Sequence, residues 1–149
     1  MKKALVMALI GTLALASCNK TNTPEVSGTN KSVTFKMMLP ADAIYKASAG
    51  TATYVDLTSK DRATTLTASG LKPNTSYLAH YHIMGTASTD ACKSAGDVLN
   101  GTIGTAMTSD ANGALTLRGL QNTAALTGAA YINIHEAATP SVVPLCAPL

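Results

Sequence analysis

Short segments that alternate apolar and polar residues recur along this chain, separated by clusters of glycine, proline, asparagine and aspartate. Side chains on a β-strand point alternately to the two faces of a sheet, so this period predicts strands with one buried face. The clearest turn signal between two such segments is 108–113, which ends in Asp-Ala-Asn-Gly. The pattern predicts an all-β protein, a sandwich or flattened barrel of about eight antiparallel strands. The expected strands are 32–39, 52–57, 64–69, 76–84, 101–107, 114–118 and 129–135, with short helical turns within 41–50 and 119–128.

The first residues have the layout of an export signal. Lys2 and Lys3 precede an apolar run, 4–16, that is shorter than the roughly 20 residues of a membrane-spanning helix. The run ends in Leu-Ala-Ser-Cys18, which resembles the lipobox of bacterial lipoproteins. We therefore expect removal of residues 1–17, lipidation of Cys18 and a location at the bacterial cell envelope, anchored to the membrane. The alternative is an ordinary cleaved signal followed by a chance cysteine.

The rest of the chain divides into a tether and one domain. Residues 18–31 are polar and lack apolar periodicity, which predicts a flexible tether. Residues 32–149 suit one domain with one core. The formal charge of +3 does not describe that domain, because four of the lysines precede residue 32 and the remaining seven basic residues are balanced by seven acidic ones. A neutral domain with few aromatic residues argues against nucleic acid as a partner.

The three cysteines divide into Cys18 at the lipobox and a pair in the domain. Cys92 and Cys146 form an even pair in an exported protein, where an oxidising compartment allows a disulfide to persist. Closing a loop of about 54 residues would stabilise the fold by about 4 kcal/mol in the chain-entropy model. We expect the pair to be bridged, and the alternative is two free thiols.

Two of the three histidines in the chain form a His-x-His motif on an expected strand. On that strand His80 and His82 point to the same face, with Cβ atoms about 7 Å apart. Two imidazoles at this spacing can converge on one metal ion. The same pattern also fits structural histidines that are satisfied by backbone groups, so the motif alone does not decide between the two.

The third histidine ends another expected strand, 129–135. There Tyr131, Asn133 and His135 share one face, and Ile132 and Ile134 share the other. His135 therefore joins the His-x-His pair on one surface if the two strands approach each other.

Several segments, in chain order, resemble the Cu/Zn superoxide dismutase family. Residues 79–96 resemble the region in which a His-x-His strand runs into a loop with a cysteine and Ser-Ala-Gly. Residues 131–136 resemble the late strand that ends in His-Glu, and the turn 70–76 resembles the turn before the His-x-His strand. Cys146 resembles the family's second disulfide cysteine. The similarity covers about 32–149, with its first third carried by the strand pattern.

The resemblance implies a superoxide dismutase-like domain, a Greek-key β-sandwich or flattened barrel, with a copper site. It implies that His80, His82 and His135 bind one copper ion, and that Cys92 and Cys146 form the disulfide that fastens the loop to the sandwich.

Other parts of the family pattern are missing. Val98 stands at about the place of the histidine that bridges copper and zinc, and the zinc-binding loop is reduced to 100–104, without histidine or aspartate. Val143 stands where the family has an arginine that guides anions. The resemblance therefore implies copper without zinc, and no positive guide for an anionic substrate.

Three functions agree with such a site. The first is superoxide dismutation, at a reduced rate because capture of the anion is not assisted. The second is a protein that holds or buffers copper at the envelope, and the third is a metal-free lipoprotein with a vestigial site. The expected partners are accordingly superoxide or copper ion, together with the membrane.

Two further residues bear on these alternatives. Met84 lies two positions beyond His82, and as an extra ligand its thioether would favour Cu(I), whereas ordinary packing is the alternative. A zinc hydrolase with a three-histidine site is a more distant interpretation, because no general base is evident. Glu136 adjoins His135 but points to the other face if the strand continues.

Overall fold

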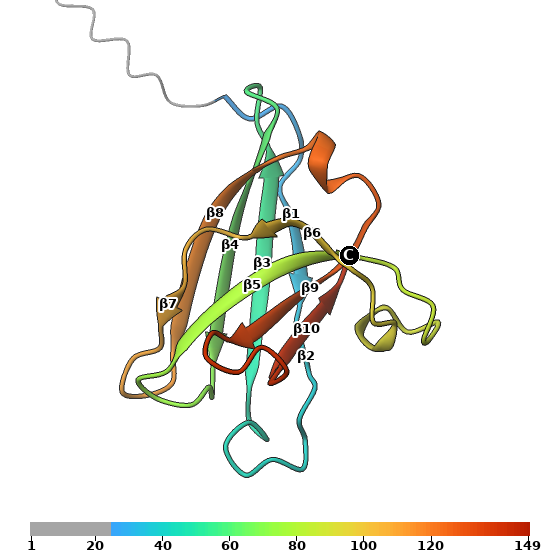
Figure 1. Cartoon of the computed structure of the whole chain (residues 1–149). Helices are drawn as coiled ribbons and strands as arrows, with labels where there is room; N and C mark the ends of the chain where they lie inside the picture. Colours follow the sequence, from blue (N-terminus) through green and yellow to red (C-terminus); the bar gives the residue numbers. More distant parts are fainter. Residues whose placement is uncertain (1–24) are drawn as a thin grey trace, which may run out of the picture.

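Two antiparallel β-sheets make up the structure, a computed structural model that describes residues 25–149 (Figure 1). One sheet has four strands in the order β1-β3-β4-β8, and the other has six, in the order β2-β10-β9-β5-β6 with β7 also paired to β5. The predicted all-β sandwich is confirmed, and eight of the described strands have four residues or more. The elements are β1 (Lys31–Thr34), β2 (Lys36–Met37), β3 (Ala49–Asp56), β4 (Asp61–Ser69), β5 (Ser76–Ile83), η1 (Ala91–Lys93), β6 (Val98–Thr102), β7 (Met107–Thr108), β8 (Leu115–Asn122), η2 (Ala124–Leu126), β9 (Ala129–Glu136) and β10 (Leu145–Pro148).

The hydrophobic core lies between the two sheets and is built from alternate strand residues. Leu66 and Leu117 enter it from the four-stranded sheet, and Tyr81, Ile132 and Ile134 enter it from the other. In Figure 1 the six-stranded sheet passes in front of β3 and β4, with β5 and β9 at its centre. The residues between these core positions on β5 and β9 therefore face away from the core, where the histidines lie.

Two expected strands are interrupted. The segment 32–39 crosses from one sheet to the other at Phe35, whose side chain is buried and whose amide donates to the carbonyl of Gly50 at 2.9 Å. The segment 101–107 breaks after Thr102, because Ile103 turns into the core and Gly104 has a φ of 71°. In both places a buried apolar residue that fits the alternating pattern ends one stretch of strand pairing, and the next stretch begins beyond it, at Lys36 and at Met107.

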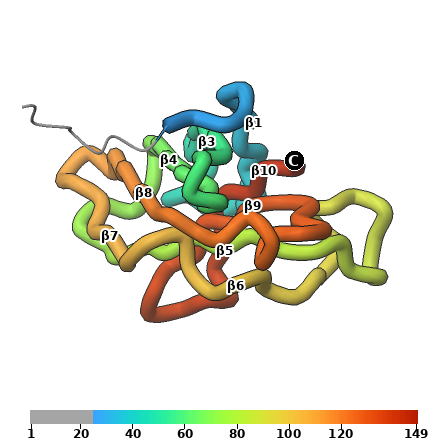
Figure 2. The backbone as a smooth tube through the Cα atoms, turned by 90° about the horizontal axis from the view of Figure 1, so that it is seen from above, coloured from blue at the N-terminus to red at the C-terminus, as the bar shows by residue number. Residues whose placement is uncertain are grey.

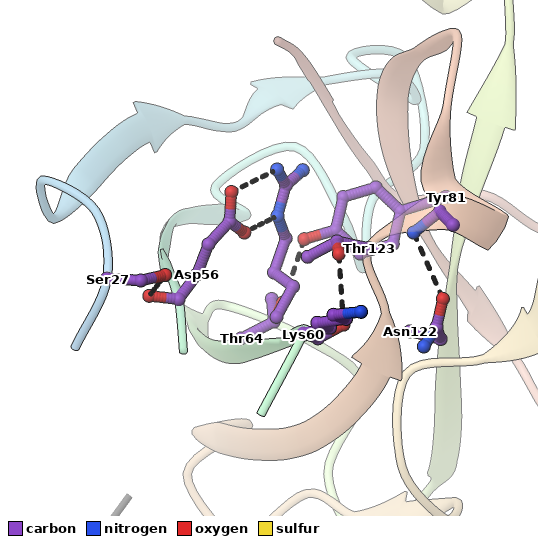
Figure 3. A network of polar contacts seen from close by, with 9 residues as sticks. Ser27, Asp56, Lys60, Thr64, Tyr81, Asn122 and Thr123 are labelled. Carbon is purple, nitrogen blue, oxygen red and sulfur yellow. Dashed lines mark hydrogen bonds and ion pairs between the residues drawn. The ribbon is translucent and has the colours of Figure 1, made fainter. Parts of the chain in front are cut away.

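The chain joins the sheet earlier than the sequence predicted. β1 begins at Lys31, Val26 forms a bridge with Leu57, and the amide and hydroxyl of Ser27 donate to the carbonyl of Asp56 at 2.9 and 3.0 Å (Figure 3). The expected tether 18–31 thus overlaps the domain from residue 25, because backbone pairing at a sheet edge does not require apolar side chains. Residues 1–24, with the expected signal 1–17 and Cys18, lie outside the described residues. Within 25–149 no helix is long and apolar enough to cross a membrane.

Tyr81 ties the strand that carries two of the histidines to the opposite sheet. Its ring is fully buried, and its hydroxyl lies 2.8 Å from Oγ1 of Thr64 on β4 (Figure 3). Burial raises the pKa of Tyr81, so the phenol remains neutral and hydrogen-bonded. Because Tyr81 stands between His80 and His82, this contact anchors the part of β5 that carries both histidines to the opposite sheet.

The long loop between β5 and β6, residues 84–97, lies beyond the ends of these strands. In Figures 1 and 2 it projects at the end of the sandwich opposite β7, and it carries η1. η1 packs against β9 and β10. This loop borders the face of the sheet on which the histidines stand.

Candidate metal centre

The three histidines come together on the outer face of β5 and β9. In the antiparallel pairing, Leu78 is opposite His135 and His80 is opposite Asn133, so His135 lies diagonally beside His80. The ring centres of His80 and His135 are 5.1 Å apart, those of His82 and His135 are 5.9 Å apart, and those of His80 and His82 are 6.0 Å apart. The approach of the two strands, on which the predicted cluster depended, is therefore present.

These distances test whether the three rings fit around one metal ion. A metal 2.0–2.1 Å from each ligating nitrogen lies about 3.2 Å from each ring centre, which places three such rings roughly 5–5.5 Å apart. One pair is within this range and the other two are somewhat wider. Among residues 25–149, no group of three histidine, cysteine, aspartate or glutamate side chains is close enough to hold a metal ion as it stands. Binding would thus require the rings to move slightly closer together.

A single hydrogen-bonding pattern orients all three imidazoles. Each Nδ1 faces a backbone carbonyl, and because a carbonyl only accepts, Nδ1 carries the proton and Nε2 has a free lone pair. Metal-ligating histidines typically donate their other N–H to such a group, which fixes both tautomer and ring direction. The pairs are His80 with Gly101 at 3.2 Å, His82 with Gly96 at 2.9 Å and His135 with Pro140 at 2.7 Å.

Two of the three imidazoles are withdrawn from solvent. His82 is 6% exposed and His135 is 9% exposed, and in the described part of the chain Nε2 of each is buried without a hydrogen-bond partner. His80 is partly exposed. The surface on which the sequence places the three histidines is thus partly covered by other residues, at His82 and His135. Buried nitrogens with free lone pairs are costly unless a donor or a metal ion satisfies them.

Tyr131 and Gly96 position His82, a role that the sequence did not reveal. The rings of Tyr131 and His82 stack with centres 4.6 Å apart and an interplanar angle of 8°. The Tyr131 hydroxyl accepts from the Gly96 amide at 3.0 Å and donates to the Gly96 carbonyl at 3.3 Å, the same carbonyl that His82 contacts. The only available signal was that Tyr131 shares a face with His135; its position opposite His82 depends on strand register.

The predicted disulfide is confirmed. Cys92 of η1 and Cys146 of β10 are bonded, with their Cα atoms 5.8 Å apart. Asp90 caps η1 by accepting from the Cys92 amide at 3.1 Å. Because Cys146 is paired with Asn133, its side chain lies on the histidine face, and the bond fastens the loop 84–97 beside the histidines.

The residues that replace missing parts of the family pattern also have defined places. Val98 on β6 is paired with His82 and is 46% exposed, so an apolar side chain borders the cluster at the position that the resemblance matches to a bridging histidine. Val143 is half-buried. Met84 follows the end of β5 beyond a register shift and is 43% exposed. Its role as an extra ligand remains a prediction.

Glu136 lies on the face opposite His135, in agreement with the alternation. It is buried and accepts a hydrogen bond from the Tyr45 hydroxyl, which also contacts the Tyr77 hydroxyl at 3.0 Å. Burial and these bonds raise the pKa of Tyr45. Glu136 therefore belongs to a buried polar cluster behind the histidines and cannot serve them as a general base.

The metal-free protein is expected to lose stability as the pH falls from 7.5 to 5. Burial lowers the pKa of His82 and His135 below the ordinary value of 6.5, against the opposing effect of their carbonyl bonds. Below pH 6.5 these two histidines therefore bind more protons in the unfolded chain than in the folded one. Their contribution to the free energy of unfolding is complete above pH 6.5, and it is lost as the pH falls toward their lower pKa in the folded state. Urea denaturation across this range measures the effect. The His82→Gln, His135→Gln variant should show a flatter profile, and an equally steep one would contradict the assignment.

Comparison of the chain with protein-family models and with curated proteins finds no match. The similarity to Cu/Zn superoxide dismutases therefore depends on the motifs at 79–96 and 131–136 and on the cysteine pair.

Proposed function

We propose that this chain is a copper-binding lipoprotein of the bacterial cell envelope, related to Cu/Zn superoxide dismutases, which holds one copper ion and no zinc. His80, His82 and His135 are the ligands in this proposal, and Cys18 carries the membrane anchor. The observation that carries it is the shared orientation of the imidazoles. Each Nδ1 is tied to a carbonyl, which leaves three Nε2 lone pairs, two of them buried and without a partner in the described part of the chain.

The chemistry of this donor set favours copper. Imidazole nitrogens suit copper in both of its oxidation states, and copper leads the affinity order of the divalent first-row ions. When bound, copper supplies the one-electron cycling on which superoxide dismutation depends. The chain's own residues hold and orient the ligands: Tyr131 and Gly96 fix His82, and the Cys92–Cys146 bond fastens the loop beside them.

Holding or buffering copper is the second candidate function, and burial of the ligands favours it. His82 and His135 are almost inaccessible, so an incoming anion would approach from the side of His80. Val98, which is paired with His82, and Met84, just beyond the end of β5, expose apolar surface at the His82 end of the cluster. Val143 stands where the resemblance places an anion-guiding arginine, so capture of superoxide should be slow even if copper is bound.

Metal analysis together with superoxide kinetics tests the proposed function. Protein purified from the membrane fraction of its native host should contain one copper per chain and no stoichiometric zinc. Stopped-flow decay of superoxide, with free copper removed, should then give a rate constant well below the diffusional ceiling of about 10⁹ M⁻¹s⁻¹. A second stoichiometric zinc would contradict the copper-only site, and a rate near the ceiling would contradict reduced catalysis. Protein that carries no metal would contradict copper binding and favour a metal-free lipoprotein with a vestigial site.

A further inference from the structure

We propose that Asn133 is a fourth member of the histidine site, whose side-chain oxygen contacts a bound copper(II) ion from the side of the sheet. This role rests on the proposed function, because it requires that the histidines bind copper. It adds an oxygen to the three nitrogens, and its expected consequence is a preference for Cu(II) over Cu(I).

The strand register places Asn133 within the cluster. On β9 it is directly opposite His80 of β5 on one side and Cys146 of β10 on the other. Its neighbours Ile132 and Ile134 are fully buried in the core, so the Asn133 side chain lies on the histidine face. Directly opposite residues on antiparallel strands have Cβ atoms about 4.5–5.5 Å apart, which is within the reach of both side chains.

The amide oxygen of Asn133 lacks a partner in the described part of the chain. The residue is 8% exposed, and its Oδ1 is buried without a hydrogen bond. Such a group destabilises the fold unless a donor or a cation satisfies it, so an unpaired one indicates a strained or functional position. Asparagine is also disfavoured in strands, where a β-branched apolar residue would pack better. The position thus has two unfavourable features that a bound ion would offset.

Side-chain length indicates how Asn133 would approach the ion. Its oxygen is two bonds from Cβ, whereas Nε2 of a histidine is three bonds from Cβ. An ion held by three Nε2 atoms would therefore lie further from the sheet than the Asn133 oxygen. That oxygen would contact the ion from the side of the sheet. Mixed nitrogen and oxygen sets suit Cu(II) in tetragonal geometry, whereas the softer Cu(I) gains little from an amide oxygen.

The variant Asn133→Leu tests this role, because it keeps the branched shape of the side chain, at the expense of some added bulk, and removes the oxygen. We expect the Cu(II) dissociation constant to rise about tenfold and that of Cu(I) to change less than twofold. The reduction potential should then rise by about 59 mV. The Cu(II) electron paramagnetic resonance spectrum should change as well. The metal-free variant should melt about 4 °C higher, since a buried unpaired group is gone.

Ser48→Ala is the matched control. Ser48 is 6% exposed and its hydroxyl is likewise buried without a partner, but it lies in the turn region before β3 and not on the histidine face. Its removal should raise the melting temperature and leave both copper constants unchanged. Asn133→Ala repeats the test without added bulk in case leucine disturbs folding.

The possible failures are distinguishable. A wild-type chain that binds neither oxidation state of copper would overturn the proposed function and the role of Asn133 together. A wild-type chain that binds copper, with Asn133 variants that bind Cu(II) equally well or lose Cu(I) and Cu(II) affinity to the same extent, would overturn only the role of Asn133.

Discussion

Without His80 and His82, the protein is expected to lose stoichiometric copper binding. The double variant His80→Gln, His82→Gln removes two of the three nitrogen donors and leaves His135 alone on β9. Loss of a residue that merely supports a ligand typically weakens metal binding by 10–100-fold, so loss of two ligands should weaken it by more than about a hundredfold. Competition with a chromophoric chelator, applied to Cu(I) and Cu(II) separately, measures the affinity.

The control introduces two glutamines at the same spacing on a strand outside the site. Thr65 and Thr67 of β4 are two positions apart on the outward face of the four-stranded sheet. Their double replacement by glutamine should leave copper binding unchanged. Tight one-to-one copper binding in the histidine double variant would rule out the assigned site, provided that its circular dichroism shows an intact fold.

Removal of the Cys92–Cys146 bond is expected to have the largest effect on stability. The bond closes a loop across 54 positions of sequence. The chain-entropy model gives a loss of about 4 kcal/mol in the free energy of unfolding, which corresponds to a fall of about 15 °C in melting temperature. Copper affinity should fall as well, by roughly tenfold, because the loop that carries Gly96, the hydrogen-bond partner of His82, is no longer fastened to β10.

Urea denaturation of the Cys92→Ser, Cys146→Ser variant, beside the wild type with and without reductant, measures this effect. Reductant should destabilise the wild type and leave the variant unchanged. Equal stability of the variant and the oxidised wild type would show that the bond adds nothing to the fold.

The parts of the fold and site that follow from local periodicity could be predicted from the sequence. His80 and His82 are two residues apart on one strand, so their common face needed no knowledge of the partner strand. The position of His135 required that β5 and β9 be neighbours. The pattern could not establish this, and only the resemblance to a known family indicated it.

Features that depend on register or on loop backbone could not be predicted. The stacking of Tyr131 on His82 and the placement of Asn133 opposite His80 follow from pairing between strands some fifty residues apart in the chain. The carbonyls that orient the imidazoles belong to two loops and to the end of β6, and a carbonyl has no sequence signature because every residue carries one. The same reason applies to the pairing of residues 25–31, which uses backbone groups of a segment whose one apolar side chain, that of Val26, is exposed.

The use of main-chain carbonyls to orient the imidazoles has a consequence for how this protein tolerates sequence drift. A side-chain partner can be lost by one substitution, whereas the Pro140 carbonyl remains whatever residue replaces proline, if the loop keeps its path. Gly96 and Gly101 are constrained only through backbone shape: a Cβ at Gly96 would lie 1.9 Å from the Ile83 carbonyl oxygen, and Gly101 has a φ of 68° in otherwise open space. Homologous loops can therefore diverge widely in side chains while each imidazole keeps its tautomer, so conservation around this site should appear in loop length and glycine positions and not in polar residues.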